Sequence, residues 1–207
     1  MPLLAPDPLE TARLSLRLVA ESDLPALLEV NGHDEVTRFL PYATWTSLAD
    51  GEAWLKRMTD LQASGLALQF VVAEKRSGVA IGTCLLFRYE EASARAELGY
   101  VLGRSHWGRG YMREALAALI DGAFLRMSLR RLEAEVDPRN VPSARLLQGL
   151  GFQKEGLLRQ RWVLKGEARD VEAFGLLRHE WPACAREGSP EPPRDLPIGR
   201  VVEGPEA

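Results

Sequence analysis

The sequence has few cysteines and no long apolar run. Its two cysteines, Cys84 and Cys184, are too few for a disulfide-stapled secreted domain and fit a reducing compartment. No apolar stretch approaches the ~20 residues that a membrane-spanning helix needs. The N-terminus, MPLLAPDP, has neither the basic nor the apolar region of a signal peptide. We therefore expect a cytoplasmic protein.

Basic residues are not in excess either. The 26 Lys and Arg residues are outnumbered by 29 Asp and Glu residues, which gives a formal net charge of -3. This balance argues against nucleic-acid binding and against a polybasic membrane-binding surface. With 46% hydrophobic and 27% charged residues among 207, the chain has the composition of a globular protein with one sizeable core.

The hydrophobic pattern predicts an α/β (α+β) fold. Apolar residues at three- and four-residue spacing predict helices beginning near Ser22, Asp34, Ser47, Gly110 and Val141. Alternation and β-forming composition predict about seven strands, at 11–19, 66–74, 80–89, 94–102, 131–136, 152–164 and 171–177. This order favours helices packed on a mixed, mostly antiparallel sheet. Because prolines crowd the end of the sequence, we expect an N-terminal extension (1–9), one domain (10–182) and a Pro-rich C-terminal tail (183–207).

The stretch from Ala94 to Met127 has the clearest functional pattern. It predicts a strand, a short basic loop with Gly108 and Gly110, and a long amphipathic helix that begins at the second glycine. Such a loop directs several backbone N–H groups and the positive end of a helix dipole toward one point. A phosphate or pyrophosphate group is the usual ligand there. A nucleotide-binding P-loop is disfavoured, because no Gly-Lys-Ser/Thr follows the glycines.

Three ordered segments resemble one family. Residues 107–115, WGRGYMREA, resemble the acyl-CoA signature of the Gcn5-related N-acetyltransferase (GNAT) superfamily, in the branch that contains the ribosomal-protein N-terminal (Rim-type) acetyltransferases. Residues 140–152 and the C-terminal strand region at 155–181 resemble later segments of the same branch. The likeness covers about residues 10 to 182, in order and at matching spacing.

The resemblance implies a GNAT fold, with helices on both faces of the sheet and a splay between its fourth and fifth strands. It also implies acetyl-CoA as cosubstrate and no metal. The pantetheine arm would pair with strand backbone at Tyr100, Val101 and Leu102, and would meet Asn140 and Ser143. The pyrophosphate would lie on the loop that contains Ser105, His106, Gly108, Arg109, Gly110 and Tyr111. Ser105 departs from the family, which often has Gln or Arg there, but a cradle of backbone groups tolerates that change.

Acetyl transfer to an amine needs a base, an oxyanion site and a proton for the thiolate. Glu97 resembles the family's strand glutamate that activates the amine, and we expect it to be the base. The alternative is a structural glutamate paired with Arg88 or Arg95. Ser143 matches the serine that supplies the proton in this branch, but a serine at a helix start also bonds local backbone. The pattern contains no nucleophile that would form a covalent intermediate.

The acceptor side is less well defined. Four residues lie in the variable region that covers the acceptor in the family: Arg38, Phe39, Tyr42 and Trp45. We expect an N-acetyltransferase that uses direct attack in a ternary complex, acting on a protein N-terminal α-amine. The alternatives are a small-molecule amine (amino acid, polyamine or antibiotic) as acceptor, succinyl-CoA as donor, and a non-catalytic acyl-CoA-binding regulatory module. A monomer and a homodimer are both compatible with the sequence.

Overall fold

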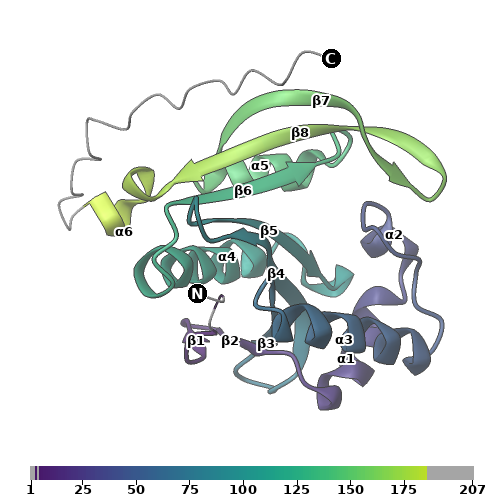
Figure 1. The fold of residues 1–207 in the computed structure, drawn as a ribbon. Helices are drawn as coiled ribbons and strands as arrows, with labels where there is room; N and C mark the ends of the chain where they lie inside the picture. The colour runs from purple at the N-terminus through teal and green to yellow at the C-terminus, as the bar shows by residue number, and fades with distance from the viewer. Residues whose placement is uncertain (1–2, 4, 186–207) are drawn as a thin grey trace, which may run out of the picture.

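The computed structural model describes residue 3 and residues 5–185. Its strands form one sheet in the order β1-β2-β3-β4-β5-β6-β8-β7 (Figure 1). The strands are β1 (Leu9–Glu10), β2 (Leu14–Leu18), β3 (Leu68–Glu74), β4 (Ala80–Glu90), β5 (Arg95–Leu102), β6 (Arg131–Val136), β7 (Gln153–Leu164) and β8 (Glu167–Leu177). Neighbouring strands are antiparallel except for the parallel pair β5 and β6. The predicted fold class is confirmed; the additional strand, β1, has two residues, too few to show alternation.

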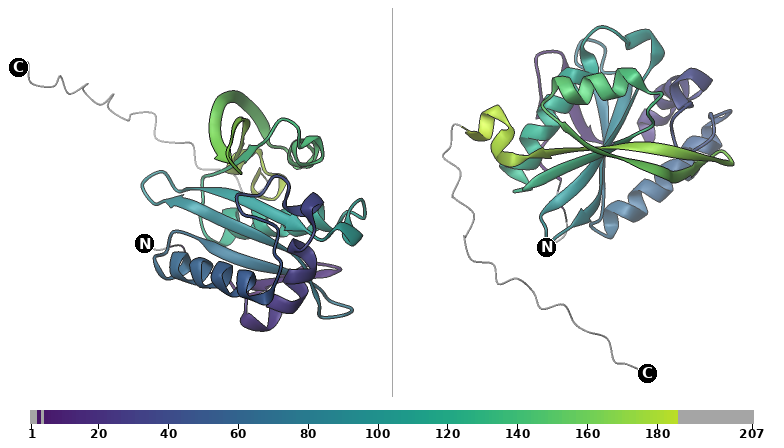
Figure 2. Two further views of the ribbon diagram at one scale, coloured as in Figure 1. Left: turned by 90° about the vertical axis from the view of Figure 1, so that its right-hand side faces the viewer. Right: turned by 90° about the horizontal axis from the view of Figure 1, so that it is seen from above.

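Helices cover both faces of this sheet (Figure 2). On one face, α1 (Leu24–Asn31) and α3 (Leu48–Ala63) bury Leu27, Trp54 and Met58 against Val71 of β3. On the other face, α4 (Tyr111–Asp121) and α5 (Val141–Gly149) join the larger core. The short helices α2 (Asp34–Thr37) and α6 (Pro182–Ala185) complete the set. The helix predicted to continue to Met127 becomes a π-helical turn at Gly122–Arg126.

Helix starts follow the local chemistry that the sequence predicts, with one exception. Before α3, the Asp50 carboxylate accepts from the backbone N–H of Ser47 at 3.1 Å, as a capping box requires. The Asn140 side chain accepts from the Ser143 N–H at 3.4 Å and caps α5. Ser22, in contrast, lies inside a 3₁₀ turn and makes no cap; here Asp23 accepts from the Ala20 N–H at 2.9 Å.

The parallel pair β5–β6 is short and opens into a splay. Its register comprises three residue pairs, the last of which is Glu97 with Glu133. Beyond Glu97, β5 continues to Leu102 beside β4 alone, while β6 continues to Val136 beside β8. The strands that the sequence places fourth and fifth therefore separate where the family resemblance requires.

The domain boundaries differ from the prediction. Leu3 and Leu9 belong to the main core, where they are 6% and 4% exposed, so the fold begins before residue 10. Cys184 is also buried in this core, so the fold continues past residue 182. The rest of the predicted tail, from residue 186 onward, lies outside the described residues.

Candidate active site

The loop between β5 and α4 has the backbone geometry of an anion cradle. Gly108 and Gly110 both adopt left-handed backbone conformations, with φ of 72° and 76°, which glycine reaches without steric cost. Gly110 is the N-cap of α4 and no side chain caps this helix. The first-turn N–H groups therefore have no intrahelical acceptor and add to the positive end of the helix dipole. This loop can hold the pyrophosphate of an acyl-CoA.

Neighbouring side chains brace the loop. Arg13 donates through Nη1 to the Arg109 carbonyl at 3.0 Å and through Nε to Glu114 at 2.6 Å, and its guanidinium stacks 4.3 Å from the centre of the Tyr111 ring. Trp107 Nε1 donates to the Leu102 carbonyl at 2.7 Å. These Arg13 contacts could not be predicted from the sequence, because Arg13 is 101 and 96 residues away from Glu114 and Arg109 along the chain.

Tyr100 and Ser143 meet across the splay. Their side-chain oxygens are 2.7 Å apart, and either can be the donor. Tyr100 comes from the part of β5 that pairs with β4 but not with β6, and Ser143 comes from the first turn of α5. Burial raises the pKa of Tyr100 to about 12, although the hydrogen bond with Ser143 opposes the shift. Two predicted site residues are thus joined in one neutral, proton-bearing pair.

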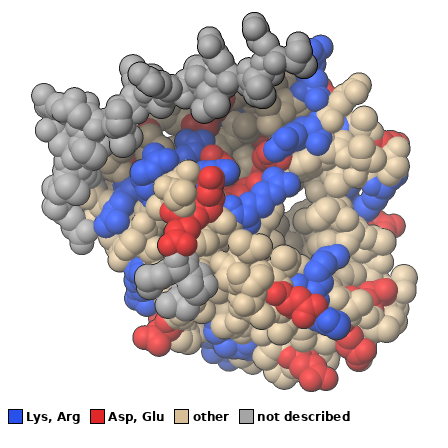
Figure 3. Space-filling model, in the orientation of Figure 1, with Lys and Arg blue, Asp and Glu red and all other residues tan. Residues whose placement is uncertain are grey.

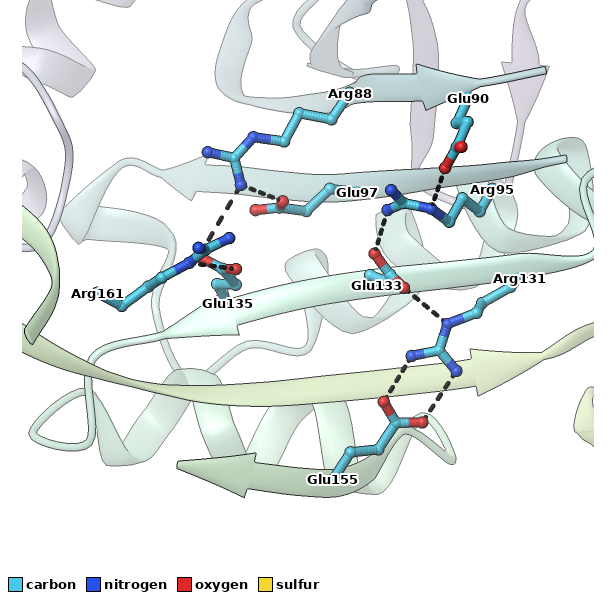
Figure 4. Close-up of polar contacts among 9 residues, drawn as sticks. All are labelled: Arg88, Glu90, Arg95, Glu97, Arg131, Glu133, Glu135, Glu155 and Arg161. Atoms are coloured by element: carbon cyan, nitrogen blue, oxygen red, sulfur yellow. Dashed lines mark hydrogen bonds and ion pairs between the residues drawn. The ribbon is translucent and has the colours of Figure 1, made fainter. Parts of the chain in front are cut away.

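Glu97 lies at the point where β5 and β6 separate, on the opposite face from that pair. Positions 97 and 100 differ by an odd number, so their side chains leave β5 on opposite faces. Glu97 is 6% exposed, and its Oε2 accepts from Arg88 Nη1 at 2.8 Å (Figure 4). Burial is the largest influence on Glu97 and raises its pKa; Arg88 lowers it, the carboxylates of Glu135 and Glu133 raise it, and the pKa lies above its usual value. Glu97 is therefore paired with Arg88 and also has a raised pKa, so its pairing does not exclude the predicted role as base, which stays a prediction.

A second carboxylate, Glu135, shares this face. It accepts from Trp162 Nε1 at 2.7 Å and from Arg161 Nε at 3.3 Å, and it lies 3.9 Å from Arg88 Nη1. The sequence prediction missed it, although the alternation in Arg131–Val136 places Glu133 and Glu135 on one side of the strand. Arg95, the other predicted partner of Glu97, instead binds Glu90 and Glu133.

The predicted acceptor residues divide into two groups. Arg38 and Phe39 follow α2, and Phe39 lies beneath the guanidinium of Arg139, whose carbon is 6.0 Å from the ring centre. Arg139 directly precedes Asn140, so these residues approach the open end of the splay. Trp45 is 4% exposed and packs on Trp54. Tyr42 packs beside Trp45 and donates to Asn31 at 3.0 Å. Tyr42 and Trp45 thus face the α1–α3 core, which does not fit a role in lining an acceptor pocket.

The β7–β8 hairpin closes this side of the molecule. Figure 1 shows it curving across the top toward α2, where Lys165 Nζ donates to the Thr37 carbonyl at 3.1 Å. In the same orientation, Figure 3 shows a hollow beneath the hairpin with basic and acidic side chains along it. The hairpin therefore covers this side of the molecule without sealing it.

A separate cavity of 680 Å³ lies beside the loop, between α1 and the start of β4. Gly103, Ser105 and His106 line it, but no residue of the splay does, so we do not place the acyl group there. Within the described part of the chain, no helix could cross a bilayer, and no group of three or more His, Cys, Asp or Glu could hold a metal ion.

The comparisons with known proteins agree with this geometry. A family model described as acetyltransferase (GNAT) domain matches residues 13–153. The chain belongs to the GNAT acetyltransferase family. The predicted family and the prediction of an acetyl-CoA-dependent N-acetyltransferase are thereby confirmed.

Relatives of this GNAT protein include characterised and uncharacterised members. It is 39% identical over 173 residues to the uncharacterized N-acetyltransferase p20 of Bacillus licheniformis, covering 84% of this chain and 97% of that one. It is 29% identical over 182 residues to ribosomal protein uS5-alanine N-acetyltransferase of Escherichia coli, covering 84% and 92%. The structure of Mycobacterium smegmatis RimJ in complex with CoA-disulfide matches with a TM-score of 0.75 at 26% identity, covering 84% and 87%.

Proposed function

We propose that this GNAT enzyme transfers an acetyl group from acetyl-CoA to the α-amine of a protein N-terminus, with Glu97 as base and Ser143 as proton donor. The observation that carries the proposal is the placement of a buried glutamate and a Tyr100–Ser143 pair on opposite faces of one splay. An amine that enters from the Glu97 face would then attack a thioester whose sulfur lies toward Ser143 on the other face.

The loop and the open edge of β5 fit the donor. Residues 105–111 supply the αL glycines and the uncapped start of α4, which suit a pyrophosphate. Tyr100, Val101 and Leu102 have strand neighbours on the β4 side only, so their outward backbone groups can pair with the amides of pantetheine. Asn140 caps α5, and this leaves its amide N–H₂ group for the same arm.

The reaction requires one bond to form and one to break. Glu97 accepts a proton from the acceptor ammonium, directly or through water, and the free amine attacks the thioester carbon. Backbone N–H groups at the open edge of β5 stabilise the developing oxyanion. As the C–S bond breaks, the nitrogen loses its second proton to water, and Ser143 protonates the departing thiolate. The hydroxyl of Tyr100 restores the proton of Ser143 through their 2.7 Å contact and regains its own from water.

A protein N-terminus is favoured as acceptor by the relatives. The Escherichia coli protein is named for the alanine of ribosomal protein uS5. A hollow lies below the β7–β8 hairpin (Figure 3), which suits the end of an extended chain. A ribosomal acceptor would be met in the cytoplasm, the compartment that the sequence predicts.

A thiol-release assay tests the proposal. The panel contains peptides with free N-terminal alanine or serine, the same peptides N-acetylated, amino acids, polyamines and aminoglycosides. We expect turnover with free N-termini only, and kcat lower by on the order of 10²–10⁴-fold in Glu97→Gln. Acetyl-CoA binding, measured by calorimetry, should be unchanged in Glu97→Gln. Turnover confined to small amines would contradict the acceptor. Acetyl-CoA binding without turnover across the panel would favour the regulatory module.

A further inference from the structure

The acceptor face of the splay carries a carboxylate on each of the two separating strands. Glu97 stands on β5 and Glu135 on β6, and their side chains are 8% and 11% exposed. Figure 4 shows both in one layer of ion pairs on this face. A cation that enters between the strands would meet a carboxylate on either side.

The guanidinium of Arg88 already lies beside these two carboxylates. Arg88 Nη1 lies 2.8 Å from Glu97 Oε2 and 3.9 Å from Glu135 Oε2. The arginine side chain is 53% exposed, so it reaches the two carboxylates from the solvent side. It contributes one hydrogen bond to Glu97 and none to Glu135, which is a loose hold for a guanidinium with five donors.

Irregular backbone on two strands brings these side chains together. Arg88 has a φ of 51° at an irregularity in the β4–β5 register. On β7, Gln160 has a φ of 50° within the shift between Leu158 and Trp162. That shift places Arg161 and Trp162 against Glu135. A left-handed conformation costs a non-glycine residue of order 1–3 kcal/mol and concentrates at functional sites, so two such residues around one carboxylate pair point to a selected arrangement.

Glu135 is held so that its charge remains available. Trp162 donates a well-aligned indole N–H at 2.7 Å, while Arg161 is a longer contact at 3.3 Å. In contrast, Glu133 on the same strand is bound by both Arg95 and Arg131 at 2.7 and 2.8 Å, on the side where β5 and β6 are still paired. Glu133 is therefore already satisfied, and Glu135 faces the opening.

We propose that Arg88 holds the position of the acceptor's ammonium group in the free enzyme, and that Glu135 binds this ammonium beside Glu97 when the acceptor displaces the guanidinium. This inference rests on the proposed function and deepens it. It makes the acceptor a primary amine that binds in its charged form. Glu97 takes the proton only after the ammonium is held by both carboxylates, and Arg88 returns when the neutral amide leaves.

Opposite effects of two substitutions test the inference. The substrate is the panel amine with the highest kcat/KM in the native enzyme. Glu135→Gln keeps an oxygen for Trp162 but removes the charge, so we expect the acceptor KM to rise about tenfold with kcat within about twofold. Arg88→Gln removes the competing cation, so the acceptor KM should fall several-fold. The acetyl-CoA KM should not change in either variant.

Two control variants separate the proposed roles of Glu135 and Arg88 from a structural role. Glu133→Gln removes a carboxylate from the same face of the same strand and should leave the acceptor KM unchanged. Arg88→Lys should restore it toward the native value. The acid limb of the pH profile of kcat/KM should also move to higher pH in Arg88→Gln. The pKa of Glu97 would rise, because Glu97 would then face Glu133 and Glu135 of β6, with Arg161 of β7 behind Glu135.

The outcomes are distinct. A native enzyme that turns over an amine, together with an unchanged acceptor KM in Glu135→Gln, would overturn this inference alone. A higher acceptor KM in Arg88→Gln would do the same, because it would make the arginine a binding group. Absence of turnover with every amine would overturn the proposed function as well.

Discussion

Glu97 combines burial with a single ionic partner. Removing a carboxylate from water favours its neutral form, and the half-exposed Arg88 only partly offsets this, so the pKa of Glu97 stays above its usual range. A carboxyl group with a raised pKa is a better match for an amine proton than an ordinary glutamate. Replacing Glu97 by glutamine should therefore raise stability at alkaline pH and lower activity.

Glu97→Gln tests this through the pH dependence of stability. A group whose pKa is raised by folding stabilises the native state below its unfolded pKa, and this contribution is lost as the pH rises through the folded pKa. Glutamine does not ionise. We expect the variant to have a higher Tm than the native protein at pH 8, with the difference shrinking toward pH 4. Thermal denaturation across this range measures it.

Glu155→Gln is the matched control. Its hydrogen bonds with Arg131 lower the pKa of Glu155, so its contribution is present above the unfolded pKa and is lost as the pH falls. This variant should have a lower Tm at pH 8, by a small amount because Glu155 is partly exposed. A Tm difference between Glu97→Gln and the native protein that does not shift in favour of the variant from pH 4 to pH 8 would contradict the raised pKa.

Tyr100 and Ser143 should act as one unit. Tyr100→Phe and Ser143→Ala each remove the 2.7 Å contact, so the double variant should lose less stability than the sum of the two. We expect a coupling free energy of about 1 kcal/mol in a denaturant-unfolding cycle. Additive losses would show that the hydrogen bond contributes nothing to the fold.

At the scale of elements, left-handed glycines set the backbone of the proposed donor loop, and Arg13 joins the loop to α4. Gly110→Ala places a β-carbon on a residue with a φ of 76°. We expect the free energy of unfolding to fall by about 1–2 kcal/mol and the Kd for acetyl-CoA to rise about tenfold or more. Calorimetry and chemical denaturation measure the two effects.

Gly156→Ala is the control for that change. A β-carbon at Gly110 meets Arg13 Nη2 at 3.5 Å, an ordinary contact distance, and one at Gly156 meets no atom within 4 Å; Gly156, however, does not have a left-handed φ. Acetyl-CoA binding should be unchanged in this variant. Equal effects of the two substitutions would mean that the added methyl group, and not the backbone conformation, weakens binding.

The sequence predicts most elements but not their irregularities. Alternation located β5 and β6, and apolar spacing located the helices that begin near Ser47 and Val141, because these signals are local. The bulges at Arg88 and Gln160 could not be predicted, since one extra residue in a strand leaves its composition unchanged. Glu135 was visible as a strand carboxylate, but its approach to Arg88 depends on how three strands are placed. Local patterns therefore predicted the backbone of the candidate donor loop better than the ion pairs around Glu135.

At the scale of the whole molecule, the β7–β8 hairpin contacts α2 through Lys165. Lys165→Ala removes its contact with the Thr37 carbonyl of α2 without changing the cost of the left-handed backbone at this position. We expect the acceptor KM to rise a few-fold and the acetyl-CoA KM to stay constant. Lys154→Ala is the control, because Lys154 pairs with Glu172 within the hairpin and does not reach α2.

The short ladder between β5 and β6 has a mechanical consequence. Three residue pairs join the half-sheet β1–β5 to the half-sheet β6–β8, so this seam can act as a hinge while each half stays rigid. A ligand that fills the gap would fix the hinge angle and bridge the two halves. Backbone amides of Leu98 to Leu102 should then exchange with deuterium more slowly when CoA is bound. The amides of β3, which has a hydrogen-bonded strand on either side, should be unaffected.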